Sequence, residues 1–431
     1  MGREACTLEC MQLSKPQNRI IQSSPRIAQV VAAAGSGKTR TVVQLVEDRL
    51  ARGIVRPGRV LLISFSRKAC GEIRERLSPV ARAAVEVSTF HSLAYRRLRE
   101  YGGGGRIITD EMKSRFFRDF MRERNTKGIP YSLLLANKPM FRTEFPELCM
   151  EVFWKFACYK REAGLVEFED LVRSMLRKLR ENAMSDLQNA YDLIIVDEFQ
   201  DTDREQLSFL GMMNFKNLIV VGDDYQSIYG FRGADPSIFV KFRDHFKDAK
   251  RYYLNENYRS LKPITQCGNQ VISFSRNQIH KRVVSMRKGR HPTLALSIER
   301  GKEESIRDLV LKNPGARILC RSNHRRFVWE RAGIPASQIS TIHSAKGLEF
   351  PVVLLDLVGG WSMLRGLTHV PPEEVRIAYV GLSRAENLLV VLHSDYTAFD
   401  PERLVFEMFR SSVKRIGHNE LADVLSGLAF V

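Results

Sequence analysis

The segment Ala32–Arg40, AAAGSGKTR, constrains the fold of this chain more than any other. It overlaps the end of an apolar run and precedes an amphipathic stretch, so we expect it to join a β-strand to an α-helix. In that setting glycines let backbone N–H groups turn inward around phosphate oxygens, and the lysine reaches the outer phosphates. The generic pattern has a glycine at the position of Ala32. The intact GSGKT nevertheless favours a nucleotide site over a plain strand–helix turn.

A second segment, VDEFQDTD at Val196–Asp203, ends another apolar run with two carboxylates. In a nucleotide site Asp197 is expected to coordinate Mg²⁺ together with Thr39, and Glu198 to orient and deprotonate the attacking water. The alternative is a pair of solvated acids at a strand end, which the presence of a phosphate loop makes weak. The two segments together indicate a P-loop NTPase and leave its class open.

The apolar runs of the chain are short, rich in Val, Ile and Leu, and apolar on both faces. This is typical of parallel strands that helices cover on both sides. Their alternation with amphipathic stretches predicts an α/β fold with doubly wound parallel sheets. The expected strands are Ala28–Ala33, Arg59–Phe65, Asp192–Glu198, Asn217–Asp223, Ala316–Arg321, Pro351–Leu357 and Asn387–His393.

The length of 431 residues exceeds what one hydrophobic core usually organises, so two or three domains are expected. Between about Tyr95 and Ala190 no such strand is expected, and the pattern is helical, as in Glu167–Asn182. We interpret this region as a helical insertion in the first α/β domain. The run Gly102–Gly105 is interpreted as a flexible joint at its start.

The net charge of +18 predicts a polyanionic partner, most simply a nucleic acid, although an inert basic surface is also common. The seven cysteines are scattered and form no CxxC pair, which fits a reducing compartment. Cys6 and Cys10 are interpreted as plain thiols. Because no apolar run could span a bilayer and the N-terminus lacks a signal region, we expect no membrane and an intracellular location: cytoplasm or nucleoid, or the nucleus of a eukaryote.

Further motifs narrow the class. The chain contains, in order, LSKPQ at Leu13–Gln17, ISFSRKACGEIRERL at Ile63–Leu77, VSTFHSLAYRRL at Val87–Leu98, VVGDDYQSIYGFRGA at Val220–Ala234, LNENYRS at Leu254–Ser260, ISTIHSAKGLEFPVV at Ile339–Val353 and VRIAYVGLSRAENLLVV at Val375–Val391. In order and wording they resemble the motif set of superfamily 1A helicases, the UvrD/PcrA/Rep group. The resemblance extends from about Leu13 to Val391.

The resemblance implies two RecA-like domains that bind ATP and Mg²⁺ in the cleft between them. The first motor domain would comprise residues 1–95 and 189–255, with a 1B-like helical insertion at 96–188, and the second would comprise 256–431. Members of the group carry an accessory subdomain, 2B, after the segment that here ends at Pro335. Since the next motif begins at Ile339, we expect that subdomain to be absent. The tail beyond His393 is expected to be too short for a nuclease domain.

The resemblance also assigns a role in ATP hydrolysis to individual residues. Gln226 would sense the γ-phosphate, while Arg259 and Arg384 would act as arginine fingers from the second domain. Tyr258 would stack on the adenine and Glu349 would contact the ribose. The remaining residues expected at the nucleotide are Gln17 at the adenine edge and Ala34, Gly35, Ser36, Gly37, Lys38, Thr39 and Arg40 at the phosphates, with Lys38, Glu198, Gln226, Arg259 and Arg384 as the catalytic set.

A path for a nucleic-acid strand follows from the same resemblance. Phe65, Tyr229 and Phe231 would stack on bases, which is tolerant of sequence because every base has a π-face. At Phe231 the group commonly has Trp, so a slightly weaker platform is expected. The segment Phe168–Val172, FEDLV, also resembles a motif of the group. The residues expected to contact the sugar-phosphate backbone are Thr89, His91, Arg232 and His343.

These expectations describe an ATP-dependent single-stranded DNA translocase and 3′–5′ DNA helicase that acts in repair, recombination or defence against foreign DNA, on single strands and duplex junctions. DNA as the substrate and the polarity rest on the resemblance alone. A protein partner, such as a nuclease or a loading factor, is hypothesised to engage the duplex. Two alternatives stay open: an NTP-driven switch that binds nucleic acid without unwinding it, and a structural nucleic-acid-binding protein, which would leave the phosphate loop unexplained.

Overall fold

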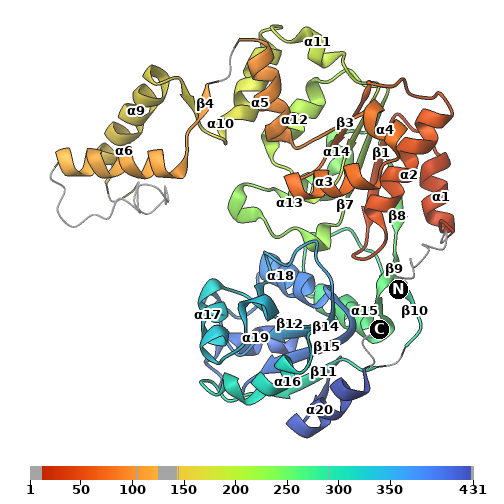
Figure 1. The fold of residues 1–431 in the computed structure, drawn as a ribbon, viewed down its shortest axis with the longest axis vertical. Coiled ribbons are helices and arrows are strands. Elements are labelled where there is room, and N and C mark those ends of the chain that lie inside the picture. Colours follow the sequence, from red (N-terminus) through yellow and green to blue (C-terminus); the bar gives the residue numbers. More distant parts are fainter. Residues whose placement is uncertain (1–11, 103–104, 125–142, 144, 290, 429–431) are drawn as a thin grey trace, which may run out of the picture. The chain divides into compact units, whose positions relative to one another are not determined.

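The computed structural model describes residues 12–102, 105–124, 143, 145–289 and 291–428, which form two compact units (Figure 1). The first unit contains residues up to Val87, Asp192–Arg204 and those from Phe215 onward. The second unit contains Ser88–Tyr191 and Glu205–Asn214. Cys6 and Cys10 lie outside the described residues, as do two glycines of the expected joint, Gly103 and Gly104.

The first unit contains two six-stranded sheets, and one of them follows the order β3-β2-β6-β7-β1-β8. Its recorded strand pairs are parallel, with Val30 of β1 opposite Val221 of β7. The carboxyl ends of β1, β6 and β7 therefore meet at one edge, where ligands bind in open α/β sheets. The strands are β1 (Ile27–Ala32), β2 (Val60–Ile63), β3 (Val85–Ser88), β6 (Leu193–Val196), β7 (Asn217–Gly222) and β8 (Lys250–Leu254).

Helices pack around this first sheet. Val42 and Val46 of α2, with Ile20 and Ile21 of α1, join the inward side chains of β1 and β7 in one apolar cluster. The helices are α1 (Lys15–Gln22), α2 (Lys38–Ala51), α3 (Arg67–Arg76), α4 (Pro79–Ala84), α13 (Pro236–Val240) and α14 (Phe242–His245), with the 3₁₀ turns η1 (Phe199–Asp201), η2 (Asp224–Gln226) and η3 (Gly230–Arg232).

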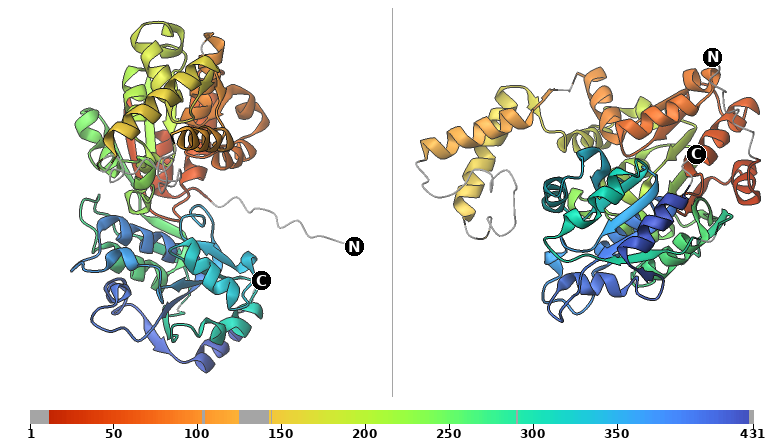
Figure 2. Two further views of the ribbon diagram at one scale, coloured as in Figure 1. Left: turned by 90° about the vertical axis from the view of Figure 1, so that its left-hand side faces the viewer. Right: turned by 60° about the horizontal axis from the view of Figure 1, so that its bottom comes forward.

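The second sheet follows the order β13-β12-β14-β15-β11-β16 and is also parallel in its recorded pairs. Helices lie on both sides of this sheet (Figure 2). Alternate residues of β14 enter different clusters: Val353 and Leu355 pack with α15, α18 and α19, whereas Val352 and Leu354 pack with α16, α17 and α20. This explains the strands' apolar character on both faces. The strands are β11 (Leu294–Ser297), β12 (Ala316–Cys320), β13 (Ile339–Thr341), β14 (Phe350–Asp356), β15 (Ala385–His393) and β16 (Lys414–Ile416).

The helices of this half are α15 (Lys262–Ile272), α16 (Arg307–Leu311), α17 (Asn323–Arg331), α18 (Pro372–Leu382), α19 (Pro401–Glu407) and α20 (His418–Gly427), with the 3₁₀ turns η4 (Glu303–Ile306), η5 (Ala336–Gln338) and η6 (Ser362–Leu364). Between α17 and β13, where every residue is described, the structure contains only the short turn η5. A separate parallel pair joins β9 (Glu256–Leu261) to β10 (Val284–Arg287).

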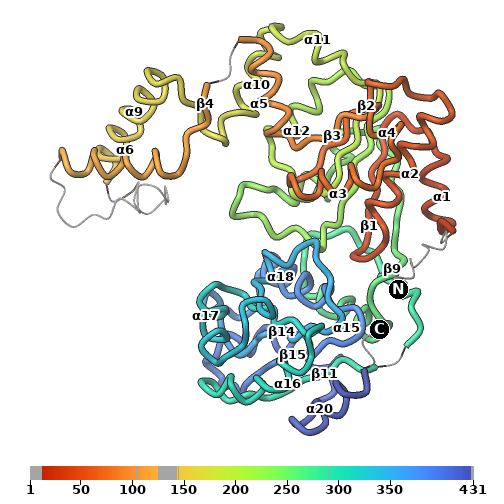
Figure 3. The backbone as a smooth tube through the Cα atoms, in the orientation of Figure 1, coloured from red at the N-terminus to blue at the C-terminus, as the bar shows by residue number. Residues whose placement is uncertain are grey.

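The second unit is mainly helical, and the chain enters it after β3 and leaves it into β6 (Figure 3). Phe117 and Phe120 of α6 pack against Val152 and Phe156 of α9 in a core of their own. The elements are α5 (Phe90–Glu100), β4 (Arg106–Ile107), α6 (Asp110–Glu123), α9 (Pro146–Glu162), β5 (Leu165–Val166), α10 (Asp170–Arg180), α11 (Ser185–Gln188) and α12 (Arg204–Met212).

The predicted fold class is confirmed, and each of the seven expected strands forms within two residues of its predicted start. The expectation of no strand between Tyr95 and Ala190 needs one small correction, because β4 and β5 pair over two residues each. The domain boundaries drawn from the sequence stay predictions. Within the described part of the chain, no helix combines the length and the hydropathy needed to cross a membrane.

Two helical glycines give a test of the packing. A Cβ at Gly381 of α18 would lie 2.7 Å from Leu355 Cδ1 of β14, whereas one at Gly71 of α3 would meet nothing within 4 Å. We expect Gly381→Ala to destabilise the fold by about 1–3 kcal/mol through overpacking. Gly71→Ala should instead stabilise it by about 0.5–1 kcal/mol, because alanine favours the helix. Melting temperatures of the two variants would check this, and equal shifts would contradict the packing of α18 on β14.

Candidate functional site

The phosphate loop lies between the end of β1 and the start of α2. Gly35 and Gly37 have φ angles of +67° and +76°, which favour glycine. A Cβ at Gly35 would also lie 2.7 Å from Arg259 Cβ. Gly37 caps α2 and offers no side-chain hydrogen bond to the N–H groups of the first turn. The loop and the helix N-terminus thus have the form of an anion site.

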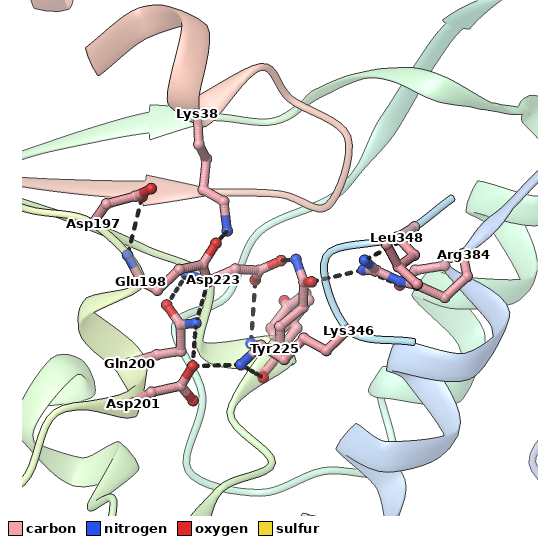
Figure 4. Close-up of polar contacts among 12 residues, drawn as sticks. Lys38, Asp197, Glu198, Gln200, Asp201, Asp223, Tyr225, Lys346, Leu348 and Arg384 are labelled. Carbon is pink, nitrogen blue, oxygen red and sulfur yellow. Dashed lines mark hydrogen bonds and ion pairs between the residues drawn. The ribbon is translucent and has the colours of Figure 1, made fainter. Parts of the chain in front are cut away.

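The two carboxylates follow β6 directly. Glu198 has a φ of +54°, an uncommon value for a residue other than glycine, and this turns its side chain toward the loop. Its Oε1 lies 3.1 Å from Lys38 Nζ, and its Oε2 accepts a hydrogen bond of 2.6 Å from Gln200 Nε2 (Figure 4). Asp197 Oδ1 accepts a hydrogen bond from the Glu198 backbone N–H at 3.0 Å. Lysine and carboxylates are therefore adjacent at the edge of the first sheet.

The electrostatics separate the two acids. Burial and the neighbouring Glu198 raise the pKa of Asp197 to about 7. Burial would also raise the pKa of Glu198, but the ammonium groups of Lys38 and Lys346 outweigh it and lower that pKa to about 2. Although burial opposes it, the pKa of Lys38 is raised by Glu198, Asp223 and Asp197. A cation bound next to Asp197 would therefore lower its pKa and favour the ionised carboxylate.

The loop after β7 brings a glutamine to the same edge. Gln226 Nε2 donates to Asp223 Oδ2 at 2.6 Å, and Gln226 Oε1 accepts from Arg384 at 2.7 Å. Arg384 stands between α18 and β15 of the second sheet and is almost fully buried. Burial lowers its pKa to about 9, so the guanidinium stays charged at neutral pH. The hydrogen bond between Gln226 and Arg384 thus joins the loop after β7 of the first sheet to the turn before β15 of the second (Figure 4).

A lysine that the sequence reasoning missed makes a second link between the sheets. Lys346 Nζ forms an ion pair with Asp201 and donates to the backbone oxygen of Gln226 at 2.9 Å. It stands in the quoted HSAKG motif, so its basic side chain among motif residues was the available signal. Burial raises the pKa of Asp201 to about 6 even though Lys346 opposes that shift.

Arg259, the other expected finger, lies on β9. Its Nε is 2.5 Å from Glu349 Oε2, and its Nη1 donates to the Ser383 backbone oxygen at 3.3 Å. Arg287, also missed from the sequence, donates to the backbone oxygens of Arg259 at 2.5 Å and of Glu386 at 3.3 Å. The backbone around both expected fingers is therefore held by one guanidinium.

The expected adenine contacts lie beside the phosphate loop. Gln17 Nε2 donates to the Ser36 backbone oxygen at 3.2 Å, and Gln17 Oε1 accepts from Ser14 N at 2.9 Å. The backbone N–H of Tyr258 donates to Gly35 at 2.9 Å, and its hydroxyl donates to Glu256. Gln17 and Tyr258 are thus fixed next to Gly35.

These residues line one cleft of about 1040 Å³ within the first unit. Ala34 alone among the expected nucleotide residues does not line it, because its side chain is buried in the core of the second sheet. Arg76 lines the cleft without having been expected there. The expected residues on its wall are Gln17, Gly35, Ser36, Gly37, Lys38, Thr39, Arg40, Phe65, Asp197, Glu198, Gln226, Tyr229, Arg232, Tyr258, Arg259, Glu349 and Arg384.

The expected base platforms form an aromatic cluster beside the cleft. The rings of Phe65 and Tyr229 stack on each other, with centroids 4.7 Å apart and planes 13° apart. Phe231 is 66% exposed and lies 5.4 Å from the ring of His343. The Arg232 guanidinium lies 5.3 Å from the Tyr229 ring and 5.5 Å from that of Phe231. The structure thus brings together aromatic and basic side chains from three of the quoted motifs.

Thr89 and His91 lie in the second unit. The Thr89 hydroxyl caps α5 by accepting from Ser92 N at 3.1 Å. The His91 ring stacks on Phe168 of the FEDLV segment, with centroids 4.2 Å apart and planes 10° apart. The stack thus joins two of the motifs quoted from the sequence, VSTFHSLAYRRL and FEDLV.

The chain matches two described protein families. Residues 13–117 and 108–247 match the UvrD/REP helicase N-terminal domain. Residues 328–396 match the UvrD-like helicase C-terminal domain. The matched ranges contain the phosphate loop, both carboxylates, Gln226, Glu349 and Arg384.

Curated relatives are similar over the same regions. The ATP-dependent DNA helicase PcrA of Staphylococcus epidermidis is 28% identical over 292 residues, which are 61% of this chain and 40% of that protein. PcrA of Leuconostoc citreum is 28% identical over 301 residues, or 63% and 40%. PcrA of Staphylococcus aureus is 28% identical over 289 residues, or 60% and 40%. The chain spans about two fifths of the length of these relatives.

The two ion pairs made by the loop between β13 and β14 should differ in strength. Lys346→Met leaves Asp201, whose side chain is 0% exposed, without its cation, which should cost about 3–5 kcal/mol. Glu349→Gln removes a pair whose carboxylate is 52% exposed, which should cost about 0–1 kcal/mol. Thermal unfolding of both variants would check this. A smaller shift for Lys346→Met than for Glu349→Gln would contradict the buried contact.

Proposed function

Because this chain belongs to the UvrD/REP helicase family, we propose that it is an ATP-driven motor that moves along single-stranded DNA and unwinds duplex DNA in the 3′–5′ direction. The observation that carries the proposal is the cleft in which Lys38, Glu198 and Gln226, beside the first sheet, face Arg384, beside the second. A site completed by two sheets can convert turnover into relative movement of those sheets. The names of the PcrA relatives support ATP as the nucleotide that is hydrolysed and DNA as the nucleic acid that is bound.

The nucleotide would bind with its phosphates at the N-terminus of α2. Backbone N–H groups of residues 35–39 and the Lys38 ammonium group would hold the phosphate oxygens. Gln17 and Tyr258 would receive the adenine, and Glu349 the ribose. Arg40 and Arg76 add positive charge to the wall of the cleft. A phosphate group would compete with Glu198 for Lys38, since Glu198 Oε1 lies 3.1 Å from Lys38 Nζ.

The donor set at this edge fits Mg²⁺, which prefers oxygen ligands. Asp197 offers a buried carboxylate with a raised pKa, which a bound cation would lower. Thr39 offers a hydroxyl at the first turn of α2. Bound there, the ion would neutralise charge on the phosphates. Glu198, with its lowered pKa, stays ionised, and it would become a stronger base toward an attacking water once the phosphates draw Lys38 away from it.

Hydrolysis would depend on residues from the second sheet. Arg384 and Arg259 carry the positive charge that stabilises the transferring phosphoryl group, a contribution of about 10³–10⁵ in rate where such fingers have been removed elsewhere. Gln226 contacts Arg384 directly, and it would sense the γ-phosphate through an amide N–H or orient the water through its amide oxygen. Movement of the second sheet would therefore make or break the catalytic set.

The strand would run over the aromatic cluster. Phe231 offers an exposed face for a base, and Arg232 and His343 lie beside it to contact the sugar-phosphate backbone. Phe65 and Tyr229 now cover each other, so a base could enter between them only if the stack opened. Thr89 and His91 are proposed to contact the backbone from the second unit.

The wider role is proposed on the same grounds. The basic net charge of +18 supports a nucleic-acid track, and repair, recombination or defence against foreign DNA would be the setting, inside the cell. The short link between α17 and β13 supports a motor without a 2B subdomain. A partner such as a nuclease or a loading factor would then engage the duplex junction.

The first test is ATP hydrolysis with and without oligodeoxynucleotide or oligoribonucleotide, on wild type and Lys38→Ala. We expect a strand of DNA to stimulate turnover by the wild type, and Lys38→Ala to abolish it because the phosphates lose their cation. A 3′-tailed and a 5′-tailed duplex, followed by strand displacement, would test polarity.

Two outcomes would change the proposal. No hydrolysis with any strand would contradict a motor. Stimulated hydrolysis without displacement of either duplex would favour an NTP-driven switch that binds nucleic acid.

The exposed platform is tested by Phe231→Ala and Phe231→Trp. Loss of the ring should weaken binding of single-stranded DNA by about 1–3 kcal/mol, whereas Trp should strengthen it because its face is larger. Phe399→Ala is the matched control, since Phe399 is also exposed and lies outside the cluster. Fluorescence anisotropy with a labelled oligonucleotide measures the affinities. An equal effect of Phe231→Ala and Phe399→Ala would contradict base stacking.

A further inference from the structure

A lysine outside every motif lies buried under the loop that carries Gln226. Lys281 belongs to residues 273–283, between α15 and β10, and its side chain is 0% exposed. Its Nζ lies 3.0 Å from Asp223 Oδ1, forms a second ion pair with Asp224, and stands 3.4 Å from the centre of the Tyr225 ring. Three successive residues of the loop thus contact one ammonium group.

The backbone of this segment is held against the same loop. Ile279 N donates to Asp224 Oδ2 at 2.7 Å. The Tyr225 hydroxyl donates to the Lys281 oxygen at 3.0 Å and accepts from the Lys281 nitrogen at 3.1 Å. Val283 exchanges two hydrogen bonds with the Asn269 side chain of α15. The segment that carries the ammonium group is therefore held by neighbours on both sides.

The charges in this pocket are interdependent. The side chains of Asp223 and Asp224 are 0% and 2% exposed, so each depends on a cation within the protein. Burial would lower the pKa of Lys281, but the two carboxylates outweigh that effect and raise it. Without Lys281, two adjacent buried carboxylates would repel each other, and their side chains would move apart.

Asp223 passes this constraint to the candidate catalytic set. While Oδ1 faces Lys281, Oδ2 accepts the 2.6 Å hydrogen bond from Gln226 Nε2. Because this bond holds the amide nitrogen of Gln226 at Asp223, the amide oxygen points to the other side. There Oε1 accepts from Arg384 at 2.7 Å. If Asp223 moved away, Gln226 would lose the acceptor that fixes its amide.

We propose that Lys281 is a positioning residue for ATP hydrolysis, which acts through Asp223 to hold the Gln226 amide oxygen toward Arg384, where it can accept a hydrogen bond from the attacking water. The inference rests on the proposed function, in which Gln226 contacts the γ-phosphate or the attacking water. Lys281 itself touches neither, and it does not line the cleft.

The test compares Lys281→Met with Arg325→Met. Arg325 is a matched control: it too is a buried cation between two carboxylates, Asp356 and Glu303, each 2.9 Å away, but it lies outside the cleft. Both variants should lower the melting temperature. At a temperature where both are folded, Lys281→Met should lower kcat by roughly 10- to 100-fold with little change in KM for ATP, because aim and not phosphate binding is lost. Arg325→Met should keep kcat within about twofold of the wild type.

A double-mutant cycle separates positioning from general destabilisation. If Lys281 acts through Gln226, the Lys281→Met/Gln226→Ala double variant should turn over at the rate of Gln226→Ala alone. Additive losses, or equal losses of kcat in Lys281→Met and Arg325→Met, would overturn the proposal. Should Lys281→Met not fold, Asp223→Asn replaces it in the cycle, since an amide at this position cannot accept from Gln226 Nε2 with the same charge.

A second readout does not depend on turnover, so it remains decisive even if wild-type protein hydrolyses no ATP and the proposed function fails. In protein labelled with ¹⁵N-glutamine, the Gln226 side-chain signal is the one lost in Gln226→Ala. Its amide protons should be protected from exchange in the wild type and in Arg325→Met, but not in Lys281→Met. Unchanged protection in Lys281→Met would overturn the link from Lys281 to Gln226.

Discussion

The candidate site depends on one hydrogen bond, between the side chains of Gln226 and Arg384, which joins the loop after β7 to the turn before β15. Although this loop follows a strand of the first sheet, it makes further contacts with the second sheet. Arg376 of α18 donates to the Ser227 oxygen at 2.7 Å, and Tyr225 and Ile228 are buried in the core of the second sheet. The loop therefore begins in one sheet and packs in the other, which makes it sensitive to any movement between them.

This arrangement explains why aromatic and charged residues alternate in the loop. Its first part, with Gln226, lies at the carboxylates and the phosphate loop, whereas Tyr229 and Phe231 lie in the aromatic cluster three to five positions later. Lys346 contacts both parts, since its Nζ donates to the Gln226 oxygen and lies 4.6 Å from the Tyr229 ring. A change at one end has a short and buried route to the other.

The sequence predicted what depends on local pattern and missed what depends on folding. Strands such as β14 were recognisable because both of their faces are apolar, but β8, with the sequence KRYYL, lies at a sheet edge and shows no such pattern. The cleft residues could be named because their motifs are contiguous. Lys281 could not, because a lysine in a polar stretch is normally exposed, and only the fold places two carboxylates around it.

The central claim is that this loop couples the cleft to the aromatic cluster, and the most direct measurement is the affinity for a non-hydrolysable ATP analogue with and without a saturating oligodeoxynucleotide. Coupled sites change each other's affinity by the same factor, commonly about 5- to 150-fold. We expect such a factor in the wild type, with the reciprocal change in oligonucleotide affinity, and a factor near one in Gln226→Ala. An analogue affinity that is the same with and without the strand in the wild type would contradict the account.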